Sequence, residues 1–142
     1  MKIKRIEHIA VVVKDMAKTS AMLENVFGLK MEYEEQIKST KLAMFPVGET
    51  YIELLQAAAP DSQVAQVLAE KGESYYHMCF EVEDIDAAVV ELKAKGVKLL
   101  NDEPRNGHGG SRIVFINPES TGNILIELAQ LAEGHADSHG AH

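Results

Sequence analysis

A histidine-led pattern that occurs twice in this 142-residue chain constrains its fold more than any other feature. One copy reads His-Ile-Ala-Val-Val-Val-Lys-Asp from His8, and the other reads His-Met-Cys-Phe-Glu-Val-Glu-Asp from His77, 69 positions later. In each copy an apolar, strand-like run follows the histidine and leads to an aspartate, a residue that favours the start of a helix. The two halves also end alike, on Ile-Glu-Leu around Glu53 and Glu127. A repeat of this length predicts two copies of one structural module.

Hydrophobic periodicity in the first half predicts the element order β-α-β-β-β. A helix is expected from the N-cap Asp15 to about Phe27, where Gly28 suits its end. Strands are expected at residues 3–13, 29–37, 41–47 and 50–56. A short connecting helix, capped by Asp61 or Ser62, should follow and end at about residue 71.

The second half repeats this order, with a helix at 85–95 capped by Asp84 and strands at 75–82, 97–100, 111–116 and 123–130. We therefore expect an α+β fold of two paired βαβββ modules, at about 3–56 and 74–130. Together they would form a curved mixed sheet with helices outside and a cleft inside. Residues 1–131 would make one domain, and the histidine-containing residues 132–142 would be a disordered tail.

Composition restricts the partners of such a domain. The net charge of −8 argues against binding to nucleic acid. No apolar run approaches the roughly 20 residues that span a membrane. The single cysteine, Cys79, excludes an internal disulfide, and these features together favour the cytoplasm. An anionic small-molecule substrate would need a local group of basic residues.

Four residues recur as candidate metal ligands: His8 and His77 near the start of the first strand of each half, and Glu53 and Glu127 in the last strand. Aliphatic residues flank both glutamates, so strand alternation places each carboxylate on the face opposite its neighbours. Mixed imidazole and carboxylate donors suit a divalent first-row metal with open coordination positions. Taken singly, each glutamate could lie on a solvated face and each histidine in the core, but their joint recurrence favours a metal site.

Other chemistry-bearing residues give weaker signals. His108 stands in a glycine-rich loop and could contact a substrate, or could be an exposed loop histidine. Cys79 alternates with apolar residues and is expected in the core. The tail histidines are expected to reflect composition.

Several stretches together resemble the vicinal oxygen chelate superfamily (glyoxalase/bleomycin resistance/dioxygenase), and within it the methylmalonyl-CoA epimerases. The resemblance covers nearly all of residues 5–130 and rests mainly on Asp-Glu-Pro-Arg from Asp102, Gly-His-Gly-Gly-Ser-Arg-Ile-Val-Phe from Gly107, and Pro-Glu-Ser-Thr-Gly from Pro118, besides the His8 and His77 stretches.

This resemblance implies an isomerase that interconverts (2R)- and (2S)-methylmalonyl-CoA by removing the C2 proton to give an enolate. It also implies that His8, Glu53, His77 and Glu127 hold a divalent ion, with cobalt expected and manganese, nickel or zinc as alternatives. Relatives of this kind commonly form homodimers. The expected partner is therefore an acyl-CoA substrate, without nucleic acid or membrane.

The resemblance also assigns acid–base and substrate roles. Glu127 is expected to act on one face of the enolate. The family's second base, a glutamate on the third strand, falls near Lys41, so that Lys41, Glu53 or a water remain candidates. Further residues are expected to bind the substrate carboxylate, phosphates or acyl group, although a surface ion pair or a turn would also explain them: Arg105, Arg112, Ser120 and Thr121.

Two other functions fit the same sequence. A lactoylglutathione lyase of the glyoxalase I type would share the four ligands and the enolate chemistry. A ligand-binding module of the same fold would need no catalytic metal, and the presence of all four ligand types argues against it.

Overall fold

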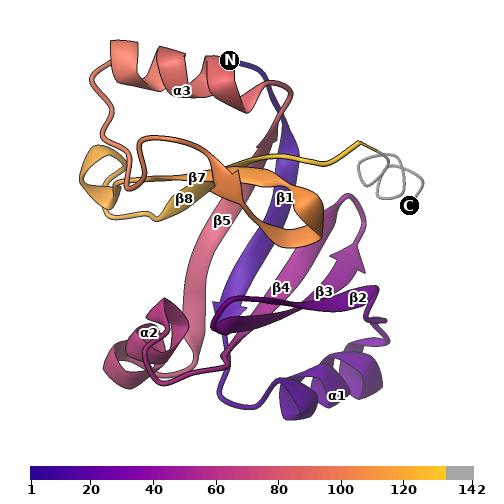
Figure 1. The fold of residues 1–142 in the computed structure, drawn as a ribbon. Helices are drawn as coiled ribbons and strands as arrows, with labels where there is room; N and C mark the ends of the chain where they lie inside the picture. The colour runs from indigo at the N-terminus through magenta and orange to yellow at the C-terminus, as the bar shows by residue number, and fades with distance from the viewer. Residues whose placement is uncertain (134–142) are drawn as a thin grey trace. The chain divides into compact units, whose positions relative to one another are not determined.

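The computed structural model describes residues 1–133, and they divide into two compact units (Figure 1). One unit contains residues 8–76, and the other contains residues 1–7 together with the described residues from 77 onward. The expected disordered tail lies, from residue 134 on, outside the described residues. Within the described part, no helix is long and apolar enough to cross a membrane.

The unit of residues 8–76 contains the first predicted module and the connecting helix. Its elements are β1 (Ile3–Val12, shared with the other unit), α1 (Met16–Phe27), β2 (Tyr33–Ile37), β3 (Thr40–Val47), β4 (Thr50–Ala57) and α2 (Gln63–Lys71). The strand order is β2-β3-β4-β1, in which β1 and β4 run parallel and the other neighbours antiparallel.

The other unit repeats this arrangement. Its elements are β5 (Ser74–Val82), α3 (Ile85–Ala94), β6 (Arg105–Asn106), β7 (Arg112–Ile116) and β8 (Ile126–Gln130), with two short 3₁₀ turns at His108–Gly110 and Pro118–Ser120. The strand order is β5-β8-β7-β6, with β5 parallel to β8 and the remaining neighbours antiparallel. The predicted α+β class and the two βαβββ modules are confirmed.

The helix signals in the repeated stretches work as predicted. The Asp15 carboxylate accepts a hydrogen bond from the backbone N of Lys18 at 3.2 Å, and Asp84 does the same for Ala87 at 3.0 Å. Each aspartate thereby satisfies a backbone donor that the first turn of a helix leaves open. Gly28 ends α1 in the left-handed conformation at φ 69°, which glycine adopts without a Cβ clash.

The strands of each module present two different faces. In the first module, α1 packs on the face that carries Ala43, Phe45 and Leu54. In the second, α3 packs on the face that carries Val114 and Leu128. Because side chains alternate along a strand, Glu53 and Glu127, each adjacent in sequence to one of these leucines, lie on the opposite face of their sheets.

Three strand predictions need correction. The strand expected at 29–37 begins only at Tyr33. Residues 97–100 form no strand, and only an isolated bridge joins Leu99 to Ile116. Val97 and Leu99 pack instead against the apolar cluster that contains buried residues of α3, β7 and β8. This packing explains the apolar pattern of residues 97–100 without a strand. The strand that completes this module is β6, which the sequence did not suggest. The last strand also begins three residues late, because Asn123 has a φ of 69°, outside the β region.

Candidate metal centre

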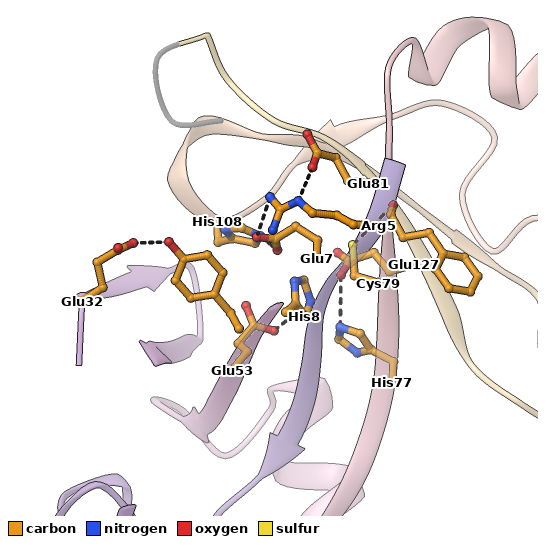
Figure 2. A network of polar contacts seen from close by, with 12 residues as sticks. Arg5, Glu7, His8, Glu32, Glu53, His77, Cys79, Glu81, His108 and Glu127 are labelled. Atoms are coloured by element: carbon orange, nitrogen blue, oxygen red, sulfur yellow. Dashed lines mark hydrogen bonds and ion pairs between the residues drawn. The ribbon is translucent and has the colours of Figure 1, made fainter. Parts of the chain in front are cut away.

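His8 and Glu53 form a buried pair inside the first module. His8 Nε2 lies 3.3 Å from Glu53 Oε1, and both side chains are at most 5% exposed. The parallel register pairs Ala10 of β1 with Glu53 of β4, so His8 lies two residues before the partner of the glutamate, on the same face. Figure 2 shows the imidazole and the carboxylate turned toward each other.

His77 and Glu127 form the same pair inside the second module. His77 Nε2 lies 3.1 Å from Glu127 Oε1, and both side chains are again at most 5% exposed (Figure 2). Here the register pairs Cys79 of β5 with Glu127 of β8, which repeats the relation seen in the first module. The recurrence found in the sequence is therefore also a recurrence of geometry.

Each pair has the donors and the spacing that a divalent ion needs. Two ligand atoms at about 2.1 Å from an ion are roughly 3.0 Å apart in octahedral and 3.4 Å apart in tetrahedral geometry. The observed separations of 3.3 and 3.1 Å lie within this range. Imidazole nitrogen with carboxylate oxygen is a donor set suited to first-row divalent metals. The residues of both modules thus fit the metal that the sequence predicts.

Arg105 lies on the same face of its sheet as Glu127. Arg105 pairs with Ile113 in the β6–β7 ladder, and Phe115, two residues along on the same face, pairs with Glu127. The guanidinium carbon lies 5.6 Å from the centroid of the Phe115 ring, a cation–π distance. The same ring meets the His77 ring edge-on, at 5.1 Å between centroids. Arg105 therefore brings an exposed positive charge close to the His77–Glu127 pair.

Arg112 lies on the other face. It pairs with Gln130 in the ladder, on the α3 side, and its two Nη atoms donate to the Asp86 carboxylate at 2.7 and 3.0 Å. This hydrogen bond lowers the pKa of Asp86 and raises that of Arg112. The surface ion pair, which the sequence left open as an alternative to substrate binding, accounts for Arg112.

Lys41 lies on the opposite face of its sheet from Glu53. The antiparallel register pairs Lys41 with Gln56, whereas Met44 pairs with Glu53. Lys41 therefore points to the side of its sheet that faces α1, opposite to Glu53. This placement argues against Lys41 as an acid or base at the His8–Glu53 pair.

Ser120 and Thr121 hold a turn. The Ser120 hydroxyl accepts a hydrogen bond from the backbone N of Lys98 at 3.0 Å. The Thr121 hydroxyl donates to the carbonyl of Ile124, three residues further on. These bonds account for both hydroxyl groups within the Pro118–Ser120 turn region, as the turn-forming alternative expected.

Sequence reasoning missed a second buried polar group in the unit that contains residues 1–7. His108 Nε2 lies 2.8 Å from Glu7 Oε1, and both side chains are at most 2% exposed. Of the two alternatives for His108, the exposed loop histidine is therefore wrong. Arg5 Nε donates to Glu81 at 2.6 Å and Arg5 Nη2 lies 4.0 Å from Glu7 (Figure 2). Glu7, directly before His8 in an apolar strand, was a signal of a buried polar residue. Nothing in the sequence identifies His108 as its partner.

Comparisons with known proteins identify the family of this chain. A model of the glyoxalase/bleomycin resistance protein/dioxygenase superfamily matches residues 7–115. The chain therefore belongs to this superfamily.

Relatives within it include methylmalonyl-CoA epimerases. The human mitochondrial methylmalonyl-CoA epimerase is 32% identical over 89% of this chain and 73% of its own length. The ethylmalonyl-CoA/methylmalonyl-CoA epimerase of Cereibacter sphaeroides is 31% identical over 91% of this chain and 99% of its own. A solved methylmalonyl-CoA epimerase in complex with methylmalonyl-CoA and NH4+ superposes with a TM-score of 0.90 at 31% identity, covering 93% of this chain and 97% of that one.

Proposed function

We propose that this protein interconverts (2R)- and (2S)-methylmalonyl-CoA. The epimerase class rests on relatives that match the chain over most of its length, and the substrate class on a similar structure that contains methylmalonyl-CoA. The observation on the molecule itself that carries the proposal is the buried imidazole–carboxylate pair that occurs in both modules with the same register.

The ligand set of the proposed site is His8, Glu53, His77 and Glu127. These residues would hold one divalent ion, with cobalt as first expectation and manganese, nickel and zinc as alternatives. When bound, the ion would supply a Lewis acid that offsets negative charge developing on the thioester oxygen. Both pairs are almost fully buried, which keeps water from competing for their donor atoms.

Glu127 is the proposed base on one face of C2. The C2 proton lies between a thioester carbonyl and a carboxylate, so its removal gives a delocalised enolate. The proton moves to a carboxylate oxygen of Glu127, and the electron pair of the C2–H bond moves toward the thioester oxygen. Phe115 is the ladder partner of Glu127 and contacts His77, and thus helps to fix both side chains.

Arg105 is the proposed anion-binding residue. The substrate carries a carboxylate and the phosphates of CoA, and a guanidinium binds either with paired hydrogen bonds. Arg105 is exposed and lies on the face of Glu127, whereas Arg112 and Lys41 lie on the opposite faces of their own sheets. We therefore leave Arg112, Lys41, Ser120 and Thr121 out of the proposed site.

The proposal extends to a homodimer in the cytoplasm. The dimer is the state expected from the family resemblance. A single cysteine, which cannot form an internal disulfide, agrees with a reducing compartment.

The test is solvent exchange at C2. Purified protein loaded with cobalt, and the same protein after treatment with a chelator, are incubated with methylmalonyl-CoA in D₂O. Deuterium should enter C2 only with the metal-loaded protein. The assay is repeated with manganese, nickel and zinc. If none of the four metals supports exchange at C2, and the protein isomerises the hemithioacetal of glutathione and methylglyoxal, a glyoxalase I activity replaces the proposal.

A further inference from the structure

An epimerase needs a proton-transferring group on each side of the planar enolate, because the proton leaves from one face and returns on the other. The proposed function, on which this inference rests, assigns Glu127 to one side. The third-strand position that the sequence offered for the second group, Lys41, lies on the wrong face of its sheet. The second group should therefore be sought on the face that carries Glu53.

The register places Glu35 on that face. Glu35 of β2 pairs with Leu42 of β3, which pairs with Leu55 of β4, two residues beyond Glu53. Residues opposite each other in a ladder share a face, as do residues two apart in one strand. With strands about 4.8 Å apart and about 3.3 Å per residue, the Cα atoms of Glu35 and Glu53 are roughly 12 Å apart. Glu35 thus stands two strands away from Glu53, on the same face of the sheet.

A carboxylate at this position departs from the apolar pattern of its face. Its same-face neighbours in β2, Tyr33 and Ile37, pack against the apolar cluster that contains Leu42 and Met44. Glu35 is half-buried between them, whereas Glu34 on the other face is exposed. Placing a charge in a row of apolar residues costs solvation free energy. Natural sequences depart from such local patterns mainly at functional sites.

The repeat provides an independent argument. In the second module the position equivalent to Glu35 is Arg105, which pairs with Ile113 as Glu35 pairs with Leu42. Each module thus extends a charged side chain from its outermost strand onto the face that carries its glutamate ligand. The charge is negative in the first module and positive in the second.

We propose that Glu35 is the second acid–base residue of the epimerase. In one direction Glu127 takes the C2 proton, and the enolate then takes a proton from the carboxylic acid of Glu35 on the opposite face. The O–H bond of Glu35 breaks, a new C2–H bond forms, and the enolate electron pair returns to C2. Glu35 is left as a carboxylate and Glu127 as a carboxylic acid, which are the starting states for the reverse reaction.

The test compares Glu35→Gln with the matched control Glu34→Gln, which removes the same charge from the next residue on the other face. Each purified variant is loaded with cobalt and assayed for inversion of each epimer, with metal content measured on the same sample. Glu35→Gln should lower kcat for inversion about 100-fold or more, while KM and the bound metal stay within about threefold of the control. Deuterium exchange, started from each epimer separately, should remain with one epimer at most.

Inversion by Glu35→Gln within threefold of Glu34→Gln would overturn the assignment. Loss of metal, or a large rise of KM that accompanies the fall of kcat, would also overturn it. Glu35 would then support the structure of the site. Deuterium exchange by Glu35→Gln at the unmodified rate from both epimers would also overturn the assignment. If the unmodified protein neither inverts methylmalonyl-CoA nor exchanges its C2 proton, the proposed function itself fails. If the unmodified protein is active and the two variants have equal activity, only the assignment of Glu35 fails.

Discussion

The Nε2 atom of His108 lies 2.8 Å from Oε1 of Glu7, and this contact ties a glycine-rich loop to the first strand within one unit of the protein. The loop is closed on itself as well, since the backbone N of Gly107 donates to the Ser111 carbonyl at 2.9 Å. A Cβ on Gly107 would lie 2.6 Å from the Ile113 side chain, so the loop can approach β7 only with glycine there.

Breaking the Glu7–His108 pair should destabilise the protein strongly. Glu7→Leu and His108→Leu each leave one buried partner without its counterpart, and each should lower the free energy of unfolding by about 3–5 kcal/mol. The double variant should lose less than the sum of the two, because both polar groups are then gone. Urea unfolding of the four proteins measures this coupling. Lys98→Ala, which breaks an exposed ion pair with Glu119, serves as the control and should change stability by less than about 1 kcal/mol.

His8→Ala and His77→Ala should each abolish tight metal binding. Each variant removes one nitrogen donor from a buried pair and leaves the rest of its module intact. Elemental analysis after dialysis should find metal in the unmodified protein and none in the variants. Added cobalt should raise the melting temperature of the unmodified protein alone, since a ligand at 100 times its Kd adds about 2.7 kcal/mol to stability. Retention of stoichiometric metal by either variant would exclude that histidine as a ligand.

Glu127→Gln should separate metal binding from turnover. The amide oxygen can still coordinate an ion, but it cannot accept the C2 proton. We expect part of the metal affinity to remain and kcat to fall by about 100-fold to 10,000-fold. Calorimetric titration with cobalt and an inversion assay on the same preparation check both statements. A rate equal to that of the unmodified protein would remove Glu127 from the proton transfer.

Arg105→Ala and Arg112→Ala form a matched pair that tests which face binds the substrate. Loss of Arg105 should raise KM for methylmalonyl-CoA about tenfold, the effect of losing one charge-assisted hydrogen bond. Loss of Arg112 should leave KM unchanged, because this guanidinium is held by Asp86 on the α3 side. The opposite result would show that the substrate contacts the helix-bearing face.

The Asp86–Arg112 ion pair predicts a pH effect of known sign. The hydrogen bond from Arg112 holds the pKa of Asp86 below its ordinary value of about 3.8. A carboxyl whose folded-state pKa is lowered stabilises the fold above its unfolded-state pKa, and this contribution is lost as the pH falls through the folded-state value. In Arg112→Ala the NMR-detected titration of Asp86 should move upward toward 3.8. An unchanged midpoint would contradict the assignment of this shift to Arg112.

The sequence allowed prediction of those features that depend on local signals or on the repeat. The caps Asp15 and Asp84 and the C-cap Gly28 are local, and each works as expected. The recurrence of the pattern singled out His8, Glu53, His77 and Glu127, and the structure shows that they form two buried pairs.

The features that escaped prediction depend on strand register. A shift of one residue moves a side chain to the other face, so counting along the chain did not distinguish Lys41 from its neighbour Leu42. Arg105 and Arg112 looked equivalent for the same reason, and the ladder separates them. The Glu7–His108 pair joins distant positions of the chain, and no periodicity links them.

Strand β1 serves both compact units, since its residues up to Glu7 belong to one and those from His8 to the other. A gene fragment that begins at the second histidine motif would therefore lack Arg5 and Glu7, which pair with Glu81 and His108. Such a half would leave buried charges without counterions and a strand edge uncovered. Recovery of a folded half should then require the missing N-terminal strand to be supplied, either as a separate peptide or by circular permutation.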